Sequence, residues 1–183
     1  DLGKAKVLNS EELKRLLIVA GHGQFKDRNI AMIYCSFGLG LRAKEIASLR
    51  IGDLIDKNNQ LLDEINLTSS MTKGNKQRHV YLSNKKVRAA LNSHIKNLSS
   101  TQPEQPFFKT QRKSRFNANT MQKWFKTMYT KAGIIGSSSH SGRRTFITNL
   151  IEQGIDIKAV SRLAGHSNIG TTAIYIEDNP ARL

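Results

Sequence analysis

Two short segments with alternating apolar residues, joined by a polar turn, constrain the fold of this chain most strongly. Residues 61–69 and 77–82 carry apolar or β-branched side chains at alternate positions, and the turn between them contains Gly74. Such alternation on both sides of a glycine-containing turn predicts a β-hairpin. Elsewhere the apolar residues recur at helical spacing. We therefore expect an α+β domain that is mostly α-helical, with one small antiparallel β-sheet.

Capping residues and glycines mark where the expected helices begin and end. Asparagine, serine and aspartate accept hydrogen bonds from the first N–H groups of a helix, and glycine allows the turn that ends one. Gly52-Asp53 is expected to end the third helix, and Gly154 and Gly165 are expected to end two later ones. The expected helices start at Asn9 or Ser10, cover 27–37 and about Leu41 to Leu49, and start again at Ser83-Asn84, Asn117 or Asn119, Ser137-Ser138-Ser139, Asp156 and near Gly170.

The chain carries a large excess of positive charge. Its 183 residues include 29 Lys and Arg against 14 Asp and Glu, a formal net charge of +15. A domain this basic repels itself, so the excess is expected to serve a polyanion, and nucleic acid is the first candidate. An anionic membrane surface is the second, but the sequence shows no strongly basic amphipathic helix with a bulky apolar face. No apolar run is long enough to cross a membrane.

The single cysteine and the N-terminus give two smaller expectations. Cys35 lies in an apolar run and cannot form an internal disulfide, so we expect a buried structural thiol. A reducing compartment fits this expectation. The chain starts at Asp1, without a methionine and without the apolar core of a signal peptide, which suggests a piece of a longer protein.

Five segments carry side chains that a phosphoryl-transfer site would need. Arg42 lies at an expected helix start, where backbone N–H groups favour an anion, and Glu45 shares its helix face. His140 and Arg143 also lie three residues apart on one expected helix face. Taken alone, Arg42 and Glu45 are more typical of an ordinary surface pair, and a pair such as His140 and Arg143 is also common on helix surfaces. The other three segments contribute Lys73 in the hairpin turn, His166 after a helix end and Tyr175 in the last helical stretch.

A basic segment outside these five also bears on nucleic-acid binding. It runs from residue 109 to 115 and contains Lys109, Arg112, Lys113 and Arg115. In a chain of this charge, phosphate contact and an ordinary solvated loop are equally open interpretations. The aromatic residues that come after it, such as Trp124 and Phe125, recur at helical spacing and are expected to belong to the core rather than to a base-stacking platform.

In this order and spacing, the motifs resemble the catalytic domain of tyrosine recombinases, the phage-integrase family that includes the Xer and Cre recombinases. The resemblance covers nearly the whole chain. The family's arginine box, hairpin lysine run, His-x-x-Arg box, Leu-x-Gly-His box and tyrosine after a Thr-Thr pair match residues 40–45, 73–78, 140–143, 163–166 and 171–175. One departure is Gly142-Arg143-Arg144, where the family often has Leu-Arg-His.

The resemblance implies a site-specific recombinase or integrase that cuts and rejoins DNA through a 3′-phosphotyrosyl intermediate, with no metal ion and no ATP. Tyr175 would be the nucleophile, His140 would accept its proton, and Lys73 would protonate the leaving 5′ oxygen. Arg42, Arg143 and His166 would bind the non-bridging phosphate oxygens, with Glu45 supporting Arg42. Further DNA contacts are expected from Lys76, Arg78, Lys109, Arg112, Lys113, Arg115 and Arg144.

The resemblance also implies a domain organisation and partners. Residues 1–183 would form the catalytic domain, with the N-terminal core-binding domain of the parent outside this chain. The expected partners are double-stranded DNA at specific recombination sites and further protomers, four in the working complex, in the cytoplasm of a prokaryotic cell at its nucleoid and with no membrane. Three alternatives remain open: a type IB topoisomerase, a non-catalytic DNA-binding module of the same fold, and a basic RNA-binding protein. The last lacks an RRM-like aromatic motif and a KH-type Gly-x-x-Gly loop.

Overall fold

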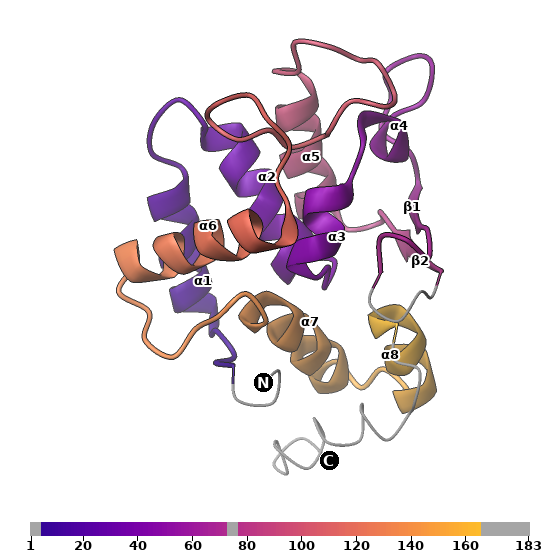
Figure 1. The fold of residues 1–183 in the computed structure, drawn as a ribbon. Helices are drawn as coiled ribbons and strands as arrows, with labels where there is room; N and C mark the ends of the chain where they lie inside the picture. The colour runs from indigo at the N-terminus through magenta and orange to yellow at the C-terminus, as the bar shows by residue number, and fades with distance from the viewer. Residues whose placement is uncertain (1–4, 73–76, 166–183) are drawn as a thin grey trace.

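The computed structural model describes residues 5–72 and 77–165, which form a mostly helical α+β domain as expected (Figure 1). The helices are α1 Ser10–Ala20, α2 Lys26–Phe37, α3 Ala43–Ser48, α4 Ile51–Leu54, α5 Lys85–Ile95, α6 Ala118–Lys131, α7 Ser141–Glu152 and α8 Ile157–Ala164. The strands are β1 Glu64–Leu67 and β2 Arg78–Tyr81. In the described ranges no helix is both long enough and apolar enough to pass through a membrane.

The predicted β-hairpin is confirmed. β1 and β2 pair antiparallel, with Ile65 opposite Val80 and Leu67 opposite Arg78. Ile65, Leu67 and Val80 are buried, while alternate residues face outward, which is the pattern of a sheet with one face on the core. A two-stranded hairpin is marginal alone, and this one packs against α4.

Helix α2 lies at the centre of the main core. It packs against α1, α3, α5 and α7, and in Figure 1 it lies between α1 and α3. Met32, Ile33 and Cys35 on this helix are fully buried. Burial raises the pKa of the Cys35 thiol to about 12, so it stays protonated at neutral pH. The prediction of a buried structural thiol is confirmed.

The C-terminal helices α7 and α8 form a second, smaller apolar cluster. Ile147, Val160 and Ala164 are buried together. Figure 1 shows the two helices next to each other below α3 and the hairpin. The fold therefore joins two parts, a large core around α2 and a small α7–α8 unit.

The expected helix caps are confirmed at four positions. Asn9 accepts from the Glu12 N–H at 2.9 Å, and the Glu12 carboxylate accepts from the Asn9 N–H at 3.0 Å. Asn84, Asn117 and Asp156 also cap their helices through side-chain oxygens. These bonds satisfy N–H groups that a helix start leaves without a partner.

The expectation that Gly52-Asp53 ends the third helix is wrong. Helix α3 ends at Ser48, and Gly52 and Asp53 lie inside the short helix α4. The Asp53 carboxylate accepts from the Arg50 N–H at 2.8 Å and starts this helix. Gly52 is needed for close packing, because a Cβ there would lie 2.8 Å from the Cβ of Pro103. This glycine therefore serves a contact with a distant loop rather than a turn.

Gly142 lies where α7 packs tightly against Ser36 of α2. A Cβ on Gly142 would lie 2.8 Å from the Ser36 Cβ and still closer to its hydroxyl. Such distances are below van der Waals contact, so no side chain fits at position 142 without a shift of the helices. This contact gives a physical reason for glycine where the resembling family often has leucine.

Gly142→Ala is accordingly expected to lower the free energy of unfolding by about 2–3 kcal/mol, because the added methyl group overpacks the α2–α7 contact. Urea denaturation measures this loss. Gly154→Ala is the matched control: Gly154 lies just after the same helix with φ +77° and has open space around it, so only backbone strain of about 1 kcal/mol is expected. Equal losses for the two variants would contradict the packing argument.

Candidate active site

The chain reaches Arg42 through a glycine turn that α7 covers. Gly40 has φ +69°, and a Cβ on it would lie 2.9 Å from Cε2 of the Phe146 ring. Glycine is therefore needed for both the backbone and the close approach of α7. Arg42 lies two residues after Gly40 and is the N-cap residue of α3. Its backbone is extended, and its side chain is 22% exposed. The predicted position of Arg42 at a helix start is confirmed.

Glu45 is a fully buried carboxylate held between two arginines. Its Oε1 accepts from the Arg42 N–H at 2.8 Å and from Nη2 of Arg78 at 2.9 Å. Its Oε2 accepts from Nη1 of Arg78 and lies 3.5 Å from Nη1 of Arg42. Paired donors of this kind are the strongest hydrogen bonds available to a carboxylate. Glu45 thus fixes the start of α3 and the position of Arg42.

Arg143 lies on the first turn of α7 and is only 1% exposed. Its Nη1 donates to the Gly40 carbonyl at 2.8 Å, and its Nη2 donates to the Ala164 carbonyl. Gly40 lies two residues before Arg42, and Ala164 lies two residues before His166. Arg143 therefore links the end of α8 to the arginine box, whose Gly40 lies 103 residues earlier in the sequence.

His140 and Arg144 lie beside Arg143 at the start of α7. His140 is the N-cap residue and is half-buried, and its N–H donates to the Ser138 hydroxyl at 3.2 Å. Arg144 is 9% exposed, and its N–H donates to the His140 carbonyl at 2.9 Å. The helix start thus holds a histidine and two arginines close together in the chain. The Arg144 side chain is buried here, and the expectation that it contacts DNA stays a prediction.

Four of the sequence-predicted site residues, Lys73, Lys76, His166 and Tyr175, lie outside the described residues. Their described neighbours nevertheless come together. A Cβ on Gly165 would lie 2.6 Å from Cδ of Arg78, so the end of α8 touches the strand that comes after the hairpin turn. The described segments before His166 and after Lys76 therefore meet at one place.

These contacts give the site a positive field. Arg42, Arg78 and Arg143 come from three separate elements, and Glu45 is the carboxylate that two of them contact. Arginine keeps its proton at any physiological pH, so the charge is permanent. A fixed cluster of guanidinium groups suits a phosphate. The arrangement can therefore bind a phosphodiester and stabilise charge that develops on it.

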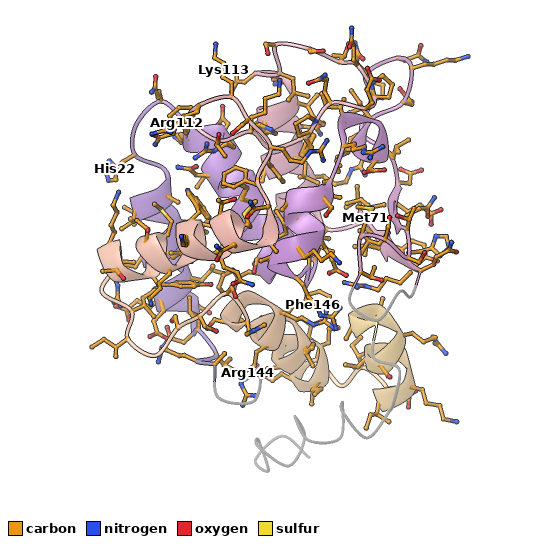
Figure 2. All side chains as sticks on the ribbon, in the orientation of Figure 1. His22, Met71, Arg112, Lys113, Arg144 and Phe146 are labelled. Carbon is orange, nitrogen blue, oxygen red and sulfur yellow. The ribbon has the colours of Figure 1, made fainter. Side chains whose placement is uncertain are left out.

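The basic segment 109–115 lies elsewhere. Its backbone folds back on itself, with Lys109 bridged to Arg115 and Lys113 at φ +61°. Arg112, Lys113 and Arg115 are exposed. Figure 2 shows Arg112 and Lys113 at the opposite end of the molecule from Arg144 and Phe146. The structure thus does not bring this loop next to the arginine cluster, and its expected DNA contact stays a prediction.

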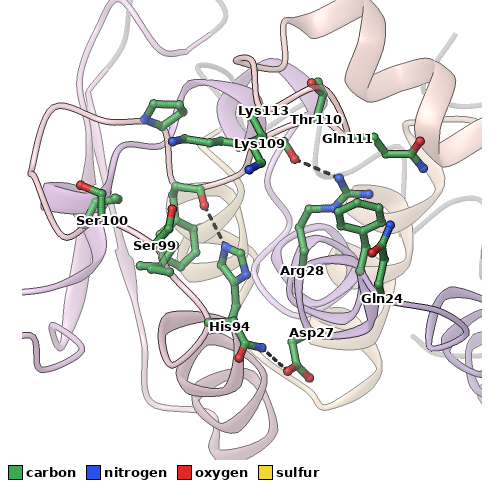
Figure 3. A pocket seen from close by; sticks show the side chains of 16 residues that line it. Gln24, Asp27, Arg28, His94, Ser99, Ser100, Lys109, Thr110, Gln111 and Lys113 are labelled. Carbon is green, nitrogen blue, oxygen red and sulfur yellow. Dashed lines mark hydrogen bonds between the residues drawn. The ribbon is translucent and has the colours of Figure 1, made fainter.

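Arg28 at the start of α2 anchors this loop. Its Nη1 donates to the Lys109 carbonyl at 2.9 Å (Figure 3), and its guanidinium lies 4.6 Å from the Phe25 ring centre. Burial lowers the pKa of Arg28 to about 10. A neighbouring hollow of about 450 Å³ is lined by Arg28, His94 and the loop. Sequence reasoning missed Arg28, because an isolated arginine in a helix gives no signal that it binds a distant carbonyl.

Known proteins are similar to this chain in sequence. The model of the Phage integrase family matches residues 6–182. Tyrosine recombinase XerA of Thermococcus kodakarensis is 35% identical over 176 residues, which cover 93% of this chain and 57% of that protein. Tyrosine recombinase XerD of Oceanobacillus iheyensis is 30% identical over 185 residues, which cover 97% and 59%. The chain thus spans less than two thirds of the length of these relatives.

Solved structures confirm the predicted fold. A crystal structure of XerA recombinase has a TM-score of 0.79 and 29% identity, covering 97% of this chain and 60% of that one. The Tn1549 transposon integrase in complex with transposon right end DNA has a TM-score of 0.71 at 22% identity, covering 93% and 61%. At 22% identity, the likeness to the Tn1549 integrase shows the fold alone. Both agree with the predicted mostly helical catalytic fold with a small antiparallel sheet.

Proposed function

The chain belongs to the phage integrase family, and from this membership we infer that it is the catalytic domain of a site-specific DNA recombinase that cuts and rejoins strands through a covalent bond to Tyr175. The observation that carries the inference is the position of Arg143, whose guanidinium bridges Gly40 and Ala164. Through these two hydrogen bonds, three segments lie next to one another: the arginine box, the His-x-x-Arg box and the chain before His166. The guanidinium groups in these segments suit the binding of a phosphodiester.

The arginines would act on the non-bridging oxygens of the scissile phosphate. Charge concentrates on these oxygens in the transition state, and guanidinium groups that are in place once DNA is bound stabilise it without reorganisation during the reaction. Arg42 is partly exposed and can reach a phosphate directly. Arg143 is 1% exposed, so its contact with DNA requires that binding uncover the guanidinium. His166 would donate to the same oxygens.

The proton transfers would involve His140 and Lys73. The free tyrosine hydroxyl has a pKa of about 10, so Tyr175 needs a proton acceptor at neutral pH. His140, at the start of α7, takes this role. Lys73 protonates the 5′ oxygen as it leaves. The tyrosyl ester keeps the energy of the broken bond, so rejoining needs no ATP, and the arginines supply the positive charge that a metal ion would supply.

Lys73→Ala is expected to slow strand cleavage by roughly 10²–10⁴-fold, because the leaving alkoxide would have no proton donor. A substrate with sulfur in the bridging 5′ position should restore the rate, since a thiolate leaves without a proton. Quenched-flow cleavage of both substrates measures this. Lys76→Ala is the control and should show no sulfur-dependent recovery. A Lys73 variant that sulfur fails to rescue would remove Lys73 from the acid role.

Double-stranded DNA is the proposed substrate, with several protomers assembled on a specific site. Among the related structures, XerH recombinase was solved bound to its difH substrate, and the lambda integrase was solved as a dimer bound to a core site. The exposed cations of the loop 109–115 would add phosphate contacts away from the cleavage point. Such contacts make affinity strongly dependent on salt.

The decisive experiment is an assay for SDS-resistant protein–DNA adducts in the presence of EDTA. Nicked duplexes are tiled across the DNA that flanks the gene, and the full-length protein is incubated with each. We expect an adduct on a small subset of duplexes, with the DNA attached at Tyr175 in the peptide map. Clear DNA binding with no adduct on any duplex would instead support the second candidate, a DNA-binding module without cleavage activity. Relaxation of plasmids that lack the site would indicate a topoisomerase.

A further inference from the structure

Arg78 of β2 forms a buried, two-point ion pair with Glu45 of α3. We propose that Arg78 is a positioning residue for strand cleavage, which neutralises Glu45 and so keeps the guanidinium of Arg42 directed to the DNA phosphate. The inference rests on the proposed recombinase function and assigns Arg78 a role other than the DNA contact expected from the sequence.

Arg78 has little capacity left for DNA. Its side chain is 8% exposed, and both of its terminal nitrogens donate to the Glu45 carboxylate. Its aliphatic part lies against Gly165, where a Cβ would come within 2.6 Å of Cδ. A phosphate contact needs an accessible terminal nitrogen. The geometry therefore directs this side chain inward, to the protein.

Glu45 in turn needs a cation. The carboxylate is 0% exposed, and an ionised buried carboxylate is stable only if it is paired and hydrogen-bonded. Arg78 supplies two parallel N–H donors at this carboxylate. The guanidinium of Arg42 is held less closely, at 3.5 Å, and stays 22% exposed. Arg78 thus binds the Glu45 carboxylate at two points, whereas the contact of the Arg42 guanidinium with it is looser.

Removal of Arg78 would redirect Arg42. Among the described residues, Arg42 is the other cation in an ion pair with Glu45. Its guanidinium would move onto the uncompensated carboxylate, because the pull of a buried charge is strong. The net charge of the three residues Arg42, Glu45 and Arg78 would fall from +1 to zero, and the scissile phosphate would lose its contact with the Arg42 guanidinium. A residue that never touches DNA would in this way control binding of the scissile phosphate.

Arg78 also joins three segments that must act together. Its strand follows Lys73 by a few residues in the sequence, its guanidinium binds the helix of Arg42 through Glu45, and its stem packs on Gly165, the residue before His166. Gly165 has φ +70°, so a glycine is required there by the backbone as well as by Arg78. The position of Arg78 therefore sets the relation of the hairpin to the two phosphate-binding segments.

The test compares Arg78→Met on two versions of the duplex that gives an adduct with the unaltered full-length protein. One has the ordinary scissile phosphodiester. The other has a methylphosphonate there, which lacks the negative charge that Arg42 would clamp. Arg78→Met should slow adduct formation by roughly 10- to 100-fold on the phosphodiester. On the neutral substrate the loss should be about threefold or less, because Arg42 contributes little there.

A double variant separates positioning from simple loss of structure. Glu45→Gln added to Arg78→Met removes the buried carboxylate that would capture Arg42, so cleavage of the phosphodiester should recover by about tenfold over Arg78→Met alone. This variant also has no unpaired buried charge, so it should fold even if Arg78→Met does not. Arg78→Lys keeps the charge but not the two-point geometry and should fall between Arg78→Met and the unaltered protein. Arg50→Met, which removes an exposed arginine, should leave the rate within about twofold.

Three results would overturn the proposal. Equal losses on the two substrates would mean that Arg78 does not act through the phosphate charge. A further loss, instead of recovery, on adding Glu45→Gln would mean that Glu45 does not capture Arg42. A fall of about one in the salt slope of DNA binding that persists when Glu45→Gln is added to Arg78→Met would make Arg78 itself a DNA contact, because Arg42 can bind the phosphate again in that double variant. If the unaltered protein forms no adduct on any duplex, the proposed function itself fails and this inference falls with it.

Discussion

Replacing Tyr175 by phenylalanine is expected to reduce formation of the covalent DNA adduct by at least about 10⁴-fold, because the ring then has no oxygen to attack the phosphate. DNA affinity should stay within about twofold, since one hydroxyl group adds little to an interface dominated by phosphate contacts. Denaturing gels measure the adduct, and mobility shifts at one fixed salt concentration measure the affinity. Loss of the adduct with retained binding would assign the chemistry to Tyr175.

Two other tyrosines serve as matched controls for this substitution. Tyr81 on β2 is 60% exposed, and Tyr129 on α6 is buried. Burial raises the pKa of the Tyr129 hydroxyl, which makes it a poor nucleophile. Tyr81→Phe and Tyr129→Phe should both leave adduct formation unchanged. If the adduct persisted in the Tyr175 variant and vanished in the Tyr81 variant, the nucleophile would be the hairpin tyrosine and the motif assignment would be wrong.

The fold could be predicted well because its signals are local. Alternation with period two around Gly74 predicted the hairpin, and Asn9, Asn84 and Asp156 marked helix starts that the structure confirms. These patterns depend on backbone geometry within a few residues. The wrong boundary at Gly52 arose because a glycine needed for contact with Pro103 looks the same in the sequence as one that ends a helix.

The site could be predicted only in part because its contacts are not local. Residue order and spacing indicated Arg42, Glu45 and Arg143, but not what each one touches. The basic run around Arg78 suggests a DNA contact, whereas the partner of this side chain is a carboxylate 33 residues away. The cross-links of Arg143 to two carbonyls leave no trace in the sequence either. Burial of an arginine is decided by tertiary structure, and composition suggests the opposite.

Arg143→Met is expected to affect both activity and stability, because the side chain has two kinds of partner. Cleavage should fall by roughly 10³-fold, since one arm of the preorganised phosphate clamp is lost. The free energy of unfolding should fall by about 1–3 kcal/mol, because the carbonyls of Gly40 and Ala164 lose a buried donor. Single-turnover cleavage and urea denaturation measure the two effects on the same preparation.

Arg143→Lys separates these effects. A lysine keeps the positive charge, but its single ammonium group cannot span two carbonyls in the planar geometry of a guanidinium. We therefore expect most of the cleavage loss to remain while part of the stability returns. Arg162→Met removes one positive charge from an exposed position on α8, so it should alter neither cleavage nor stability. Cleavage restored to within about tenfold by lysine would mean that charge alone is required, and the bridge between Gly40 and Ala164 would then serve the fold rather than the phosphate.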